Sequence, residues 1–464
     1  MIPQVTNMKS NRLSTGPTLL LIAVLTCFEL HAQSIFDEAT KTTSANKNEN
    51  RNAVEIHGYG RTVMYLNPEK ASWGNTFAET ELRLHARHES AIIRADLRLR
   101  RSISEGEGSW QAEPRELFAG ISTDRFDLLV GYQIVSWGRT DGFNPTGNIS
   151  AKNYFFLSDN PDDQWMSNLM LRTRIRPFRA MELEIIGIPV YQSSVYQYEL
   201  FDLGTNVRFA KPVLPARIPE NATLAARLNF EWPALGASVS WFRGYDPNHG
   251  FGVQQIDWSG GAPSITNAAI SYLKTSWGAD FAVPIGSTIF RAEAARNITE
   301  NPDNKMHIPL SDWSYVGAIE KSVGGLTVIA QYIGKYVPDF SELPVPVLSD
   351  PLNPMAQMQY ANNMIMYENR LFNRRIFHQQ KKSNHAVSIT FSGTFAYDTW
   401  KPELTAYYNL SSGDWLMRGV LRKSINDALE VSTGASFMGG REKSLFRYSA
   451  DIMNGIFAAL KVSF

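Results

Sequence analysis

Eight arginines are set at even spacings in three segments of the chain, a pattern that could bind anions. They are Arg83 and Arg87, then Arg94, Arg98 and Arg100, then Arg172, Arg174 and Arg176. A guanidinium group stays charged at every physiological pH and matches the geometry of a carboxylate. If these side chains line one water-filled wall, they raise the local concentration of anionic solutes.

Acidic residues accompany the arginines at the same even spacings. Glu79 and Glu81 precede Arg83, and Asp96 lies between Arg94 and Arg98. Opposite charges on facing strands pair readily, and the register between strands does not follow from the sequence. The pattern therefore supports two interpretations, an anion-attracting wall and a wall stiffened by ion pairs.

The residues between the arginines are apolar, and this alternation indicates β-strands. Leu82 and Leu84 separate the charged residues of the first segment, as Leu97 and Leu99 do in the second. Alternate side chains of a strand point to opposite faces, so each segment has one charged and one apolar face. A globular all-β secreted protein would show the same alternation. Its dry interior, however, would have to bury many arginines at a large desolvation cost.

Patterns of catalysis and of nucleic-acid binding are missing from the sequence. It lacks the zinc-protease, nucleophile-elbow, Walker and Rossmann motifs. His85 and His88 fall on opposite faces of a strand and cannot share a metal, and Pro161 interrupts the acidic cluster 159–163, which favours a turn over a calcium loop. Lys and Arg number 45 against 45 Asp and Glu, without the positive excess that nucleic acid requires. We therefore expect no enzymatic activity, metal, cofactor or nucleic-acid partner. The enzymatic alternative is a barrel lipase that uses one of four histidines, His249, His307, His378 or His385.

The N-terminus has the features of a secretory leader. Basic residues precede the apolar run 18–28, and the small residue Ala32 follows at a suitable cleavage position. A run of 11 residues is too short for the roughly 20 that span a bilayer. We expect residues 1–32 to be a signal peptide and the polar residues 33–52 to be a flexible periplasmic segment. The single cysteine, Cys27, would be lost with the leader, which is consistent with export.

The rest of the chain, 53–464, is divided by breaks that are alternately short and long. Tight turns such as 323–325 alternate with long polar segments such as 102–114 and 337–383. An even number of about 18 strands, with 16 as the alternative, and this alternation predict an all-β, transmembrane, antiparallel up-and-down barrel. Aromatic residues recur near the strand ends and predict an interfacial girdle. They are Tyr65, Tyr132, Trp137, Trp232, Trp241, Tyr245, Trp313, Tyr332, Tyr336, Trp400, Tyr407, Tyr408 and Trp415.

The last ten residues fit a lipid-facing closing strand. Ile456, Leu460 and Val462 share one face, and the chain ends on Phe464. In this feature the sequence resembles the bacterial outer-membrane barrels, whose closing strand with a terminal Phe is the usual signal for the barrel-assembly machinery. The resemblance implies an outer-membrane location in a Gram-negative bacterium, with membrane lipid and the assembly machinery as partners. The oligomeric state stays open.

The segment 131–165 is the most individual part of the chain. Its Gly131-Tyr132-Gln133 start, Trp137-Gly138 and Asn144-Pro145 are similar to the corresponding strand and loop of the 18-stranded alginate-export-like porins and related uncharacterised porin-like families. Such a loop, folded into the barrel, would bring charged and aromatic side chains to a constriction. They are Arg139, Asp141 and Lys152, with Trp137, Phe143, Tyr154 and Trp165 able to stack on sugar rings. The other interpretation is an external loop packed on its own aromatics.

The expected function is a porin-like channel for passive diffusion of small solutes. The arginines suggest anionic solutes such as acidic sugars as the finer expectation. The alternative is a non-conducting barrel that acts as a scaffold or surface-attachment protein through the long loops 189–222 and 337–383. Within the second of these, residues 351–382 lose the strand alternation, which indicates a helix in an outer loop.

Overall fold

A computed structural model describes residues 52–68, 72–73, 75–104, 107–200 and 206–464. The predicted signal peptide, 1–32, and all but the last residue of the predicted periplasmic segment, 33–52, lie outside the described residues. The first described strand begins at Asn52.

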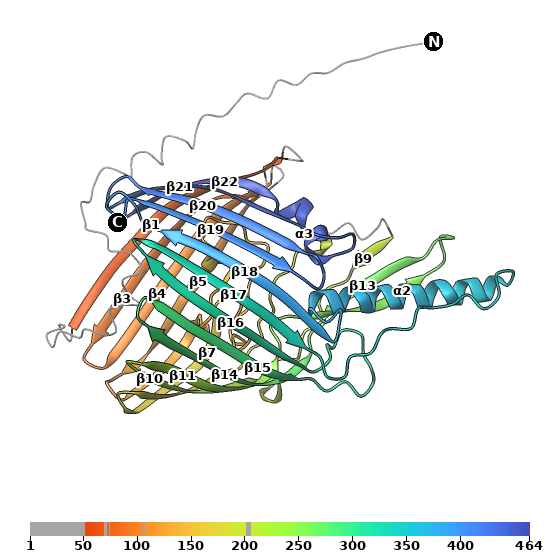
Figure 1. The fold of residues 1–464 in the computed structure, drawn as a ribbon, viewed down its shortest axis with the longest axis horizontal. Helices are drawn as coiled ribbons and strands as arrows, with labels where there is room; N and C mark the ends of the chain where they lie inside the picture. Colours follow the sequence, from red (N-terminus) through yellow and green to blue (C-terminus); the bar gives the residue numbers. More distant parts are fainter. Residues whose placement is uncertain (1–51, 69–71, 74, 105–106, 201–205) are drawn as a thin grey trace, which may run out of the picture.

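Eighteen strands of the described chain form a closed antiparallel barrel, which confirms the predicted fold class and strand number (Figure 1). The barrel closes where β1 pairs with the last strand, from Tyr59 opposite Ser463 to Leu66 opposite Ile456. The strands are β1 (Asn52–Asn67), β3 (Thr76–His88), β4 (Ala91–Ser104), β5 (Glu107–Ser122), β6 (Phe126–Gln133), β7 (Asn168–Phe178), β8 (Met181–Ile188), β10 (Thr223–Trp232), β11 (Leu235–Tyr245), β14 (Leu273–Ile285), β15 (Thr288–Ile298), β16 (Asp312–Val323), β17 (Leu326–Tyr336), β18 (Ser383–Gly393), β19 (Trp400–Asn409), β20 (Trp415–Ser424), β21 (Leu429–Gly439) and β22 (Gly455–Ser463).

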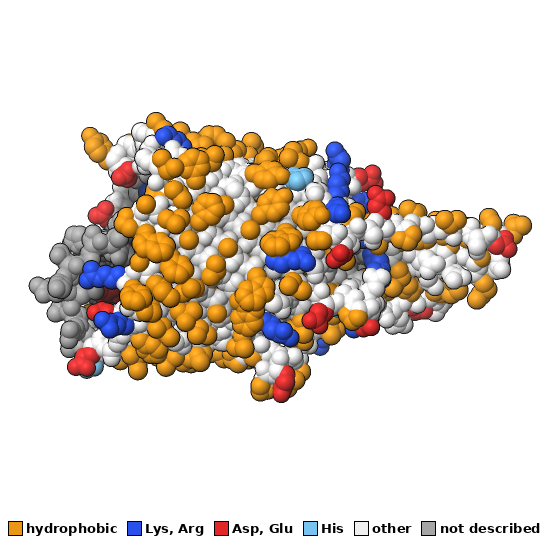
Figure 2. Space-filling view, turned by 60° about the horizontal axis from the view of Figure 1, so that its bottom comes forward, with side chains coloured by type: hydrophobic (Ala, Val, Ile, Leu, Met, Phe, Trp, Pro, Cys, Tyr) orange, Lys and Arg blue, Asp and Glu red, His pale blue; other side chains and the backbone are white. Residues whose placement is uncertain are grey.

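The two faces of the strands differ as the alternation predicted. In β3, Leu82 on the outer face is 46% exposed, whereas Glu81 on the inner face is 2% exposed. Hydrophobic side chains cover the middle of the barrel surface in the view of Figure 2, and most charged side chains lie towards its two ends. An apolar outer band with a polar interior is the arrangement that lipid requires of a barrel.

Short turns join the strands at one end of the barrel, and most connections at the other end are long. The short turns share one end with the start of β1 and the end of β22, which makes that end periplasmic. The prediction of a long loop over 102–114 was wrong, because β4 continues to Ser104 and β5 begins at Glu107. The pairing of Asp96 with Glu116 and of Leu97 with Pro114 leaves an extra residue between them. This bulge accommodates a proline inside a strand.

The outer end carries additional elements beside the barrel. They are β2 (Ser72–Trp73), a three-stranded sheet of β9 (Val207–Phe209), β12 (Gly250–Asp257) and β13 (Ser264–Ile270), the helices α2 (Pro354–Ile376) and α3 (Leu445–Met453), and the 3-10 turns η3 (Tyr198–Leu200) and η4 (Pro219–Asn221). A further 3-10 turn, η2 (Pro161–Gln164), belongs to the connection between β6 and β7. Helix α2 confirms the helix predicted within 351–382, and it projects beyond the barrel together with the small sheet (Figure 1). Over the described ranges, no helix is long and apolar enough to span a membrane.

The predicted aromatic girdle is correct for most of its members and wrong for three. Trp232, Trp313 and Trp415 are among those with large exposed fractions on the outer face, 50%, 48% and 42% respectively. Three others, Tyr65, Trp137 and Tyr407, are no more than 7% exposed and lie inside the barrel. Proximity to a strand end does not decide which face a ring occupies. Neighbours such as Tyr407 and Tyr408 of β19 point to opposite faces, so one of the two had to lie inside the barrel.

Candidate functional site

The connection between β6 and β7, residues 134–167, lies inside the barrel and is called the inner loop. It bonds to strands on several sides of the wall, including β4, β8, β15 and β20. Its apolar side chains Val135, Trp137 and Ile149 pack with Met170 and Phe242 of the wall. The loop is therefore held across the interior, which is where a constriction would lie.

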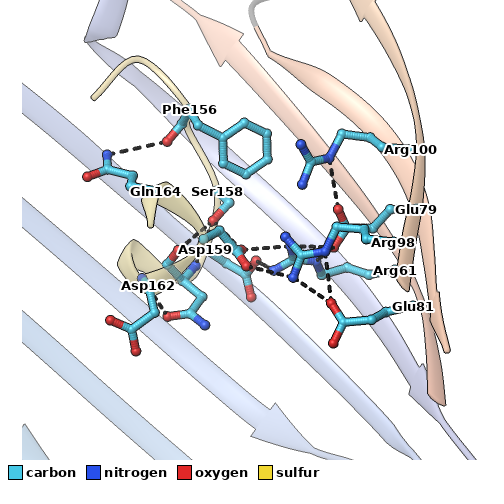
Figure 3. Close-up of polar contacts among 12 residues, drawn as sticks. Arg61, Glu79, Glu81, Arg98, Arg100, Phe156, Ser158, Asp159, Asp162 and Gln164 are labelled. Carbon is cyan, nitrogen blue, oxygen red and sulfur yellow. Dashed lines mark hydrogen bonds and ion pairs between the residues drawn. The ribbon is translucent and has the colours of Figure 1, made fainter. Parts of the chain in front are cut away.

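One end of the inner loop is fixed by two arginines of the wall (Figure 3). Arg61 of β1 pairs with Asp163 at 2.7 Å and with Asp159 at 2.9 Å, and Arg98 of β4 pairs with Asp163 at 3.2 Å. All four side chains are at most 8% exposed. Burial would raise the pKa of Asp163, but the two guanidinium groups outweigh this and hold the pKa below its usual range. We call this cluster the arginine anchor.

Carboxylates of β3 complete the arginine anchor. Glu79 accepts hydrogen bonds from Arg61 at 2.6 Å and from Arg100 at 2.9 Å, and Glu81 accepts one from Arg98 at 2.9 Å. Buried charges are stable only when they are paired and hydrogen-bonded. The acidic partners in β3 therefore let the arginines remain charged inside the barrel while they hold the loop.

Strands β20 and β21, which lie beyond β22 on the other side of β1, also hold this end of the loop. Arg418 of β20 donates to the backbone oxygens of Ser158 and Asp159, at 3.0 and 2.9 Å. Arg422 donates to the backbone oxygen of Asp159 at 2.9 Å, and Ser432 donates to its carboxylate at 3.1 Å. Asp159 thus connects β1 on one side with β20 and β21 on the other.

A buried carboxylate of β15 fixes the first part of the inner loop. Glu293 accepts hydrogen bonds from the backbone nitrogen and hydroxyl of Thr146 at 2.7 and 2.8 Å, from the hydroxyl of Thr140 at 3.0 Å and from the backbone nitrogen of Arg139 at 3.2 Å. A Cβ at Gly138, where φ is +106°, would lie 2.5 Å from Oε2 of Glu293. Glycine is therefore required for the loop backbone to approach this carboxylate.

Arg139, Asp141 and Trp137 of the predicted constriction group are bound to the wall. Arg139 pairs with Asp280 at 2.6 Å and with Glu231 at 2.7 Å, and Asp141 pairs with Arg291 at 3.0 Å. Trp137 donates to a carboxylate oxygen of Glu184 at 2.6 Å. These three residues hold the loop in place and do not line the cavity described below.

The eight arginines of the predicted ladder all lie on the inward parity of their strands, and seven of them form ion pairs. Besides the arginine anchor, Arg83 pairs with Glu81 at 2.7 Å, Arg94 with Asp96 at 2.8 Å and Arg172 with Glu184 at 2.5 Å. Arg174 and Arg176 share Asp127. Arg87 donates to the backbone oxygen of Glu89 at 3.3 Å. Most of the positive charge on this wall is thus neutralised by neighbouring carboxylates.

A cavity of about 660 Å³ lies between the inner loop and the outer elements. Phe143, Lys152, Tyr154 and Trp165 of the predicted constriction group line it, as do residues of β14, β16, β17, α2 and α3. Phe143 stacks on Tyr407 of β19, with ring centroids 5.1 Å apart. The cavity has the size of a small-molecule site, and it is reached by four of the seven predicted residues.

Charged side chains in the cavity are few and mostly paired. Lys274 pairs with Asp246, and Lys335 pairs with Asp312 at 3.2 Å. The ammonium of Lys152 lies 3.9 Å from the ring centroid of Trp165, and no carboxylate lies within 4 Å of it in the part of the chain that the structure describes. Burial lowers the pKa of Lys152.

The residues that sequence reasoning missed are the partners of the inner loop. Arg61, Asp280 and Glu293 determine where the loop lies, yet they come from strands far apart in the chain. Glu293 alternates with alanines in β15, so its inward direction could have been predicted. Its hydrogen bonds to Thr140 and Thr146, about 150 residues earlier, could not.

The closed 18-stranded barrel with its apolar outer band has the architecture of an outer-membrane β-barrel. The fold is similar to that of three solved structures. OpdQ of Pseudomonas aeruginosa has a TM-score of 0.50 at 9% identity, and the match covers 89% of this chain and 98% of OpdQ. OccK9 (OpdG) of the same organism has a TM-score of 0.50 at 8% identity, and the match covers 89% of this chain and 97% of OccK9. OccAB4 of Acinetobacter baumannii has 0.50 at 7% identity over 90% of this chain and 98% of its own. No protein-family model and no curated protein matches the sequence. At these identities the likeness establishes the fold alone.

Proposed function

We propose that this protein is a porin-like channel for the passive diffusion of small solutes across the outer membrane. The observation that carries the proposal is the inner loop, which is bonded to the wall inside the barrel and leaves a cavity of about 660 Å³ on its outer side. A loop that narrows a wide barrel without filling it sets a size limit for solutes. A barrel that serves only as a scaffold has no need of such a loop.

The finer proposal is a preference for anionic solutes such as acidic sugars. Lys152 supports it, since this lysine lines the cavity beside Trp165 and has no carboxylate within 4 Å among the described residues. The aromatic rings of Tyr154 and Trp165 fit the apolar faces of sugar rings. The eight arginines of the ladder contribute less to this preference than eight free charges would, because seven of them form ion pairs with carboxylates.

A non-conducting scaffold remains the second candidate, and the projecting helix favours it. Helix α2 extends beyond the barrel (Figure 1), and residues 351–367 at its outer part carry no charge. Leu352 is 91% exposed and Met355 is 73% exposed. Exposed apolar side chains on a projecting element are suited to a partner surface.

Planar-bilayer recording with the purified protein separates the two candidates. We expect stable stepwise currents after insertion, whereas boiled protein gives none. A folded barrel, recognised by its faster migration in unheated SDS gels, that inserts without carrying current would overturn the channel proposal and leave the scaffold.

A further inference from the structure

We infer that the cavity admits polyhydroxylated acids that carry a single negative charge and disfavours those that carry two, with Lys152 as the specificity-determining residue. This inference rests on the proposed channel function. It concerns the number of charges on the solute, which the general preference for anions leaves open.

The first step is the charge of the cavity. Three lysines and two aspartates line it, which leaves one net positive charge with histidines counted as neutral. Lys274 is paired with Asp246 and receives a further contact from Asn148, whose amide oxygen lies 2.8 Å from its ammonium. Asp312, the partner of Lys335, also accepts a hydrogen bond from Gln379 at 2.9 Å. Both pairs are thus engaged within the wall.

The second step is the position of Lys152. Its ammonium contacts the ring of Trp165, and its partial burial disfavours the charged form. Asp162 attracts it only from beyond ion-pairing distance. A carboxylate of a solute would restore the lost solvation at this point. The other basic groups of the cavity do not offer a second site: burial lowers the pKa of His378 to about 4, and His385 is hydrogen-bonded to the hydroxyl of Tyr332 at 2.6 Å.

The third step is the cost of a second negative charge. Within the described lining, the nearest remaining cations are those that Asp246 and Asp312 already neutralise. A second carboxylate would therefore be desolvated opposite two aspartates without gaining a partner. The uncharged part of a solute is better accommodated, because the ring of Trp165 and the amide groups of Gln164 and Asn248 line the same cavity.

The test uses three solutes with the same six-carbon chain: glucitol, gluconate and glucarate, with zero, one and two negative charges. Their permeabilities are measured in proteoliposomes, and those of the two anions also from bi-ionic reversal potentials. The wild-type protein should pass gluconate roughly tenfold faster than glucarate, the ratio that about 1.4 kcal/mol produces. Lys152→Gln should bring this ratio close to one by slowing gluconate. Lys305→Gln, on an exposed outer loop with a side chain 54% exposed, is the matched control and should keep the wild-type ratio.

The opposite change completes the test. Asp246→Asn and Asp312→Asn each leave one lysine of the cavity unpaired. Each should lower the ratio of gluconate to glucarate permeability by speeding the passage of glucarate. Two variants are used because either substitution could impair folding, which gel mobility detects. Equal permeabilities of gluconate and glucarate in the wild-type protein would overturn the inference, as would a wild-type ratio in folded Lys152→Gln. Failure of all three solutes to permeate would instead contradict the proposed channel.

Discussion

Arg61 of β1 and Asp163 of the inner loop form an ion pair of 2.7 Å between Nη2 and Oδ2, although 102 residues separate them in the chain. Both side chains are 5% exposed. This pair and its neighbours turn basic residues of the wall into an attachment point for the loop. The width of the lumen therefore depends on contacts at the wall as well as on the number of strands.

Removing the acidic side of the arginine anchor should widen the channel. Asp159→Asn with Asp163→Asn leaves Arg61 and Arg98 without their loop partners, and loss of one member of a buried pair costs about 3–5 kcal/mol. We expect single-channel conductance to rise roughly twofold as the loop leaves the wall. Asp162→Asn in the same turn is the control, since Asp162 forms no ion pair within the described residues. Unchanged conductance in the folded double variant would show that the anchor does not position the loop.

Glu293 is the second attachment point of the inner loop, and its removal should also widen the channel. Glu293→Ala removes the acceptor of four hydrogen bonds from Arg139, Thr140 and Thr146. Each bond to a charged group contributes about 1.5–3 kcal/mol, so the first part of the loop should become mobile. Current noise and conductance are the measurements, with the exposed Glu300→Ala as the matched variant. A quiet channel of wild-type conductance would exclude this role for Glu293.

Acid should leave the arginine anchor intact over the range in which most carboxylates remain ionised. The pKa of Asp163 is lowered, so its contribution is fully present above the ordinary Asp value near 3.9 and is lost only as the pH falls towards its own lower pKa. Conductance at pH 5 should therefore equal that at pH 7. An opening of the channel between these values, abolished by Asp163→Asn, would contradict this assignment.

As the pH rises, the anion preference should weaken at a lower pH than it would if it depended on a lysine of ordinary pKa. Burial lowers the pKa of Lys152, so its positive charge is lost below the usual value near 10.4. The reversal potential in a salt gradient should move towards zero between pH 7 and pH 10. Lys152→Gln should start closer to zero and respond less to pH; an identical response in both proteins would assign the titration to another group.

The C-terminal Phe464 should be needed for assembly. It exchanges two backbone hydrogen bonds with Gly58 at 2.9 Å, and its ring lies where a Cβ of residue 58 would be. Phe464→Ala should lower the amount of heat-modifiable barrel in outer-membrane fractions, while Phe464→Tyr should retain most of it. Equal amounts of the wild-type protein and the two variants would show that Phe464 is not part of the assembly signal.

The sequence predicted what depends on local periodicity. Glu81 and Leu82 differ in side-chain type and point to opposite faces, so the inward and outward faces of the strands followed from alternation. The barrel class needed the even number of strands and the spacing of the turns as well. The helix within 351–382 and the lipid-facing Ile456 and Leu460 were predicted in the same way.

Predictions that required long-range pairing were incomplete. Whether Arg98 faces free solvent or Asp163 depends on where a loop 65 residues away folds, and strand periodicity contains no such information. The rings of Tyr65, Trp137 and Tyr407 were assigned to the girdle from strand-end position alone. Strand parity distinguishes Tyr407 from its neighbour Tyr408, whereas the position of Trp137 depends on how the inner loop folds.

The reversal potential of the wild-type protein in a planar bilayer, under a potassium chloride gradient at pH 7, tests the central claim most directly. A channel narrowed by the inner loop beside Lys152 predicts stepwise currents with a reversal potential on the anion-selective side. Absence of current from folded, inserted protein, or a reversal potential on the cation-selective side, would contradict it.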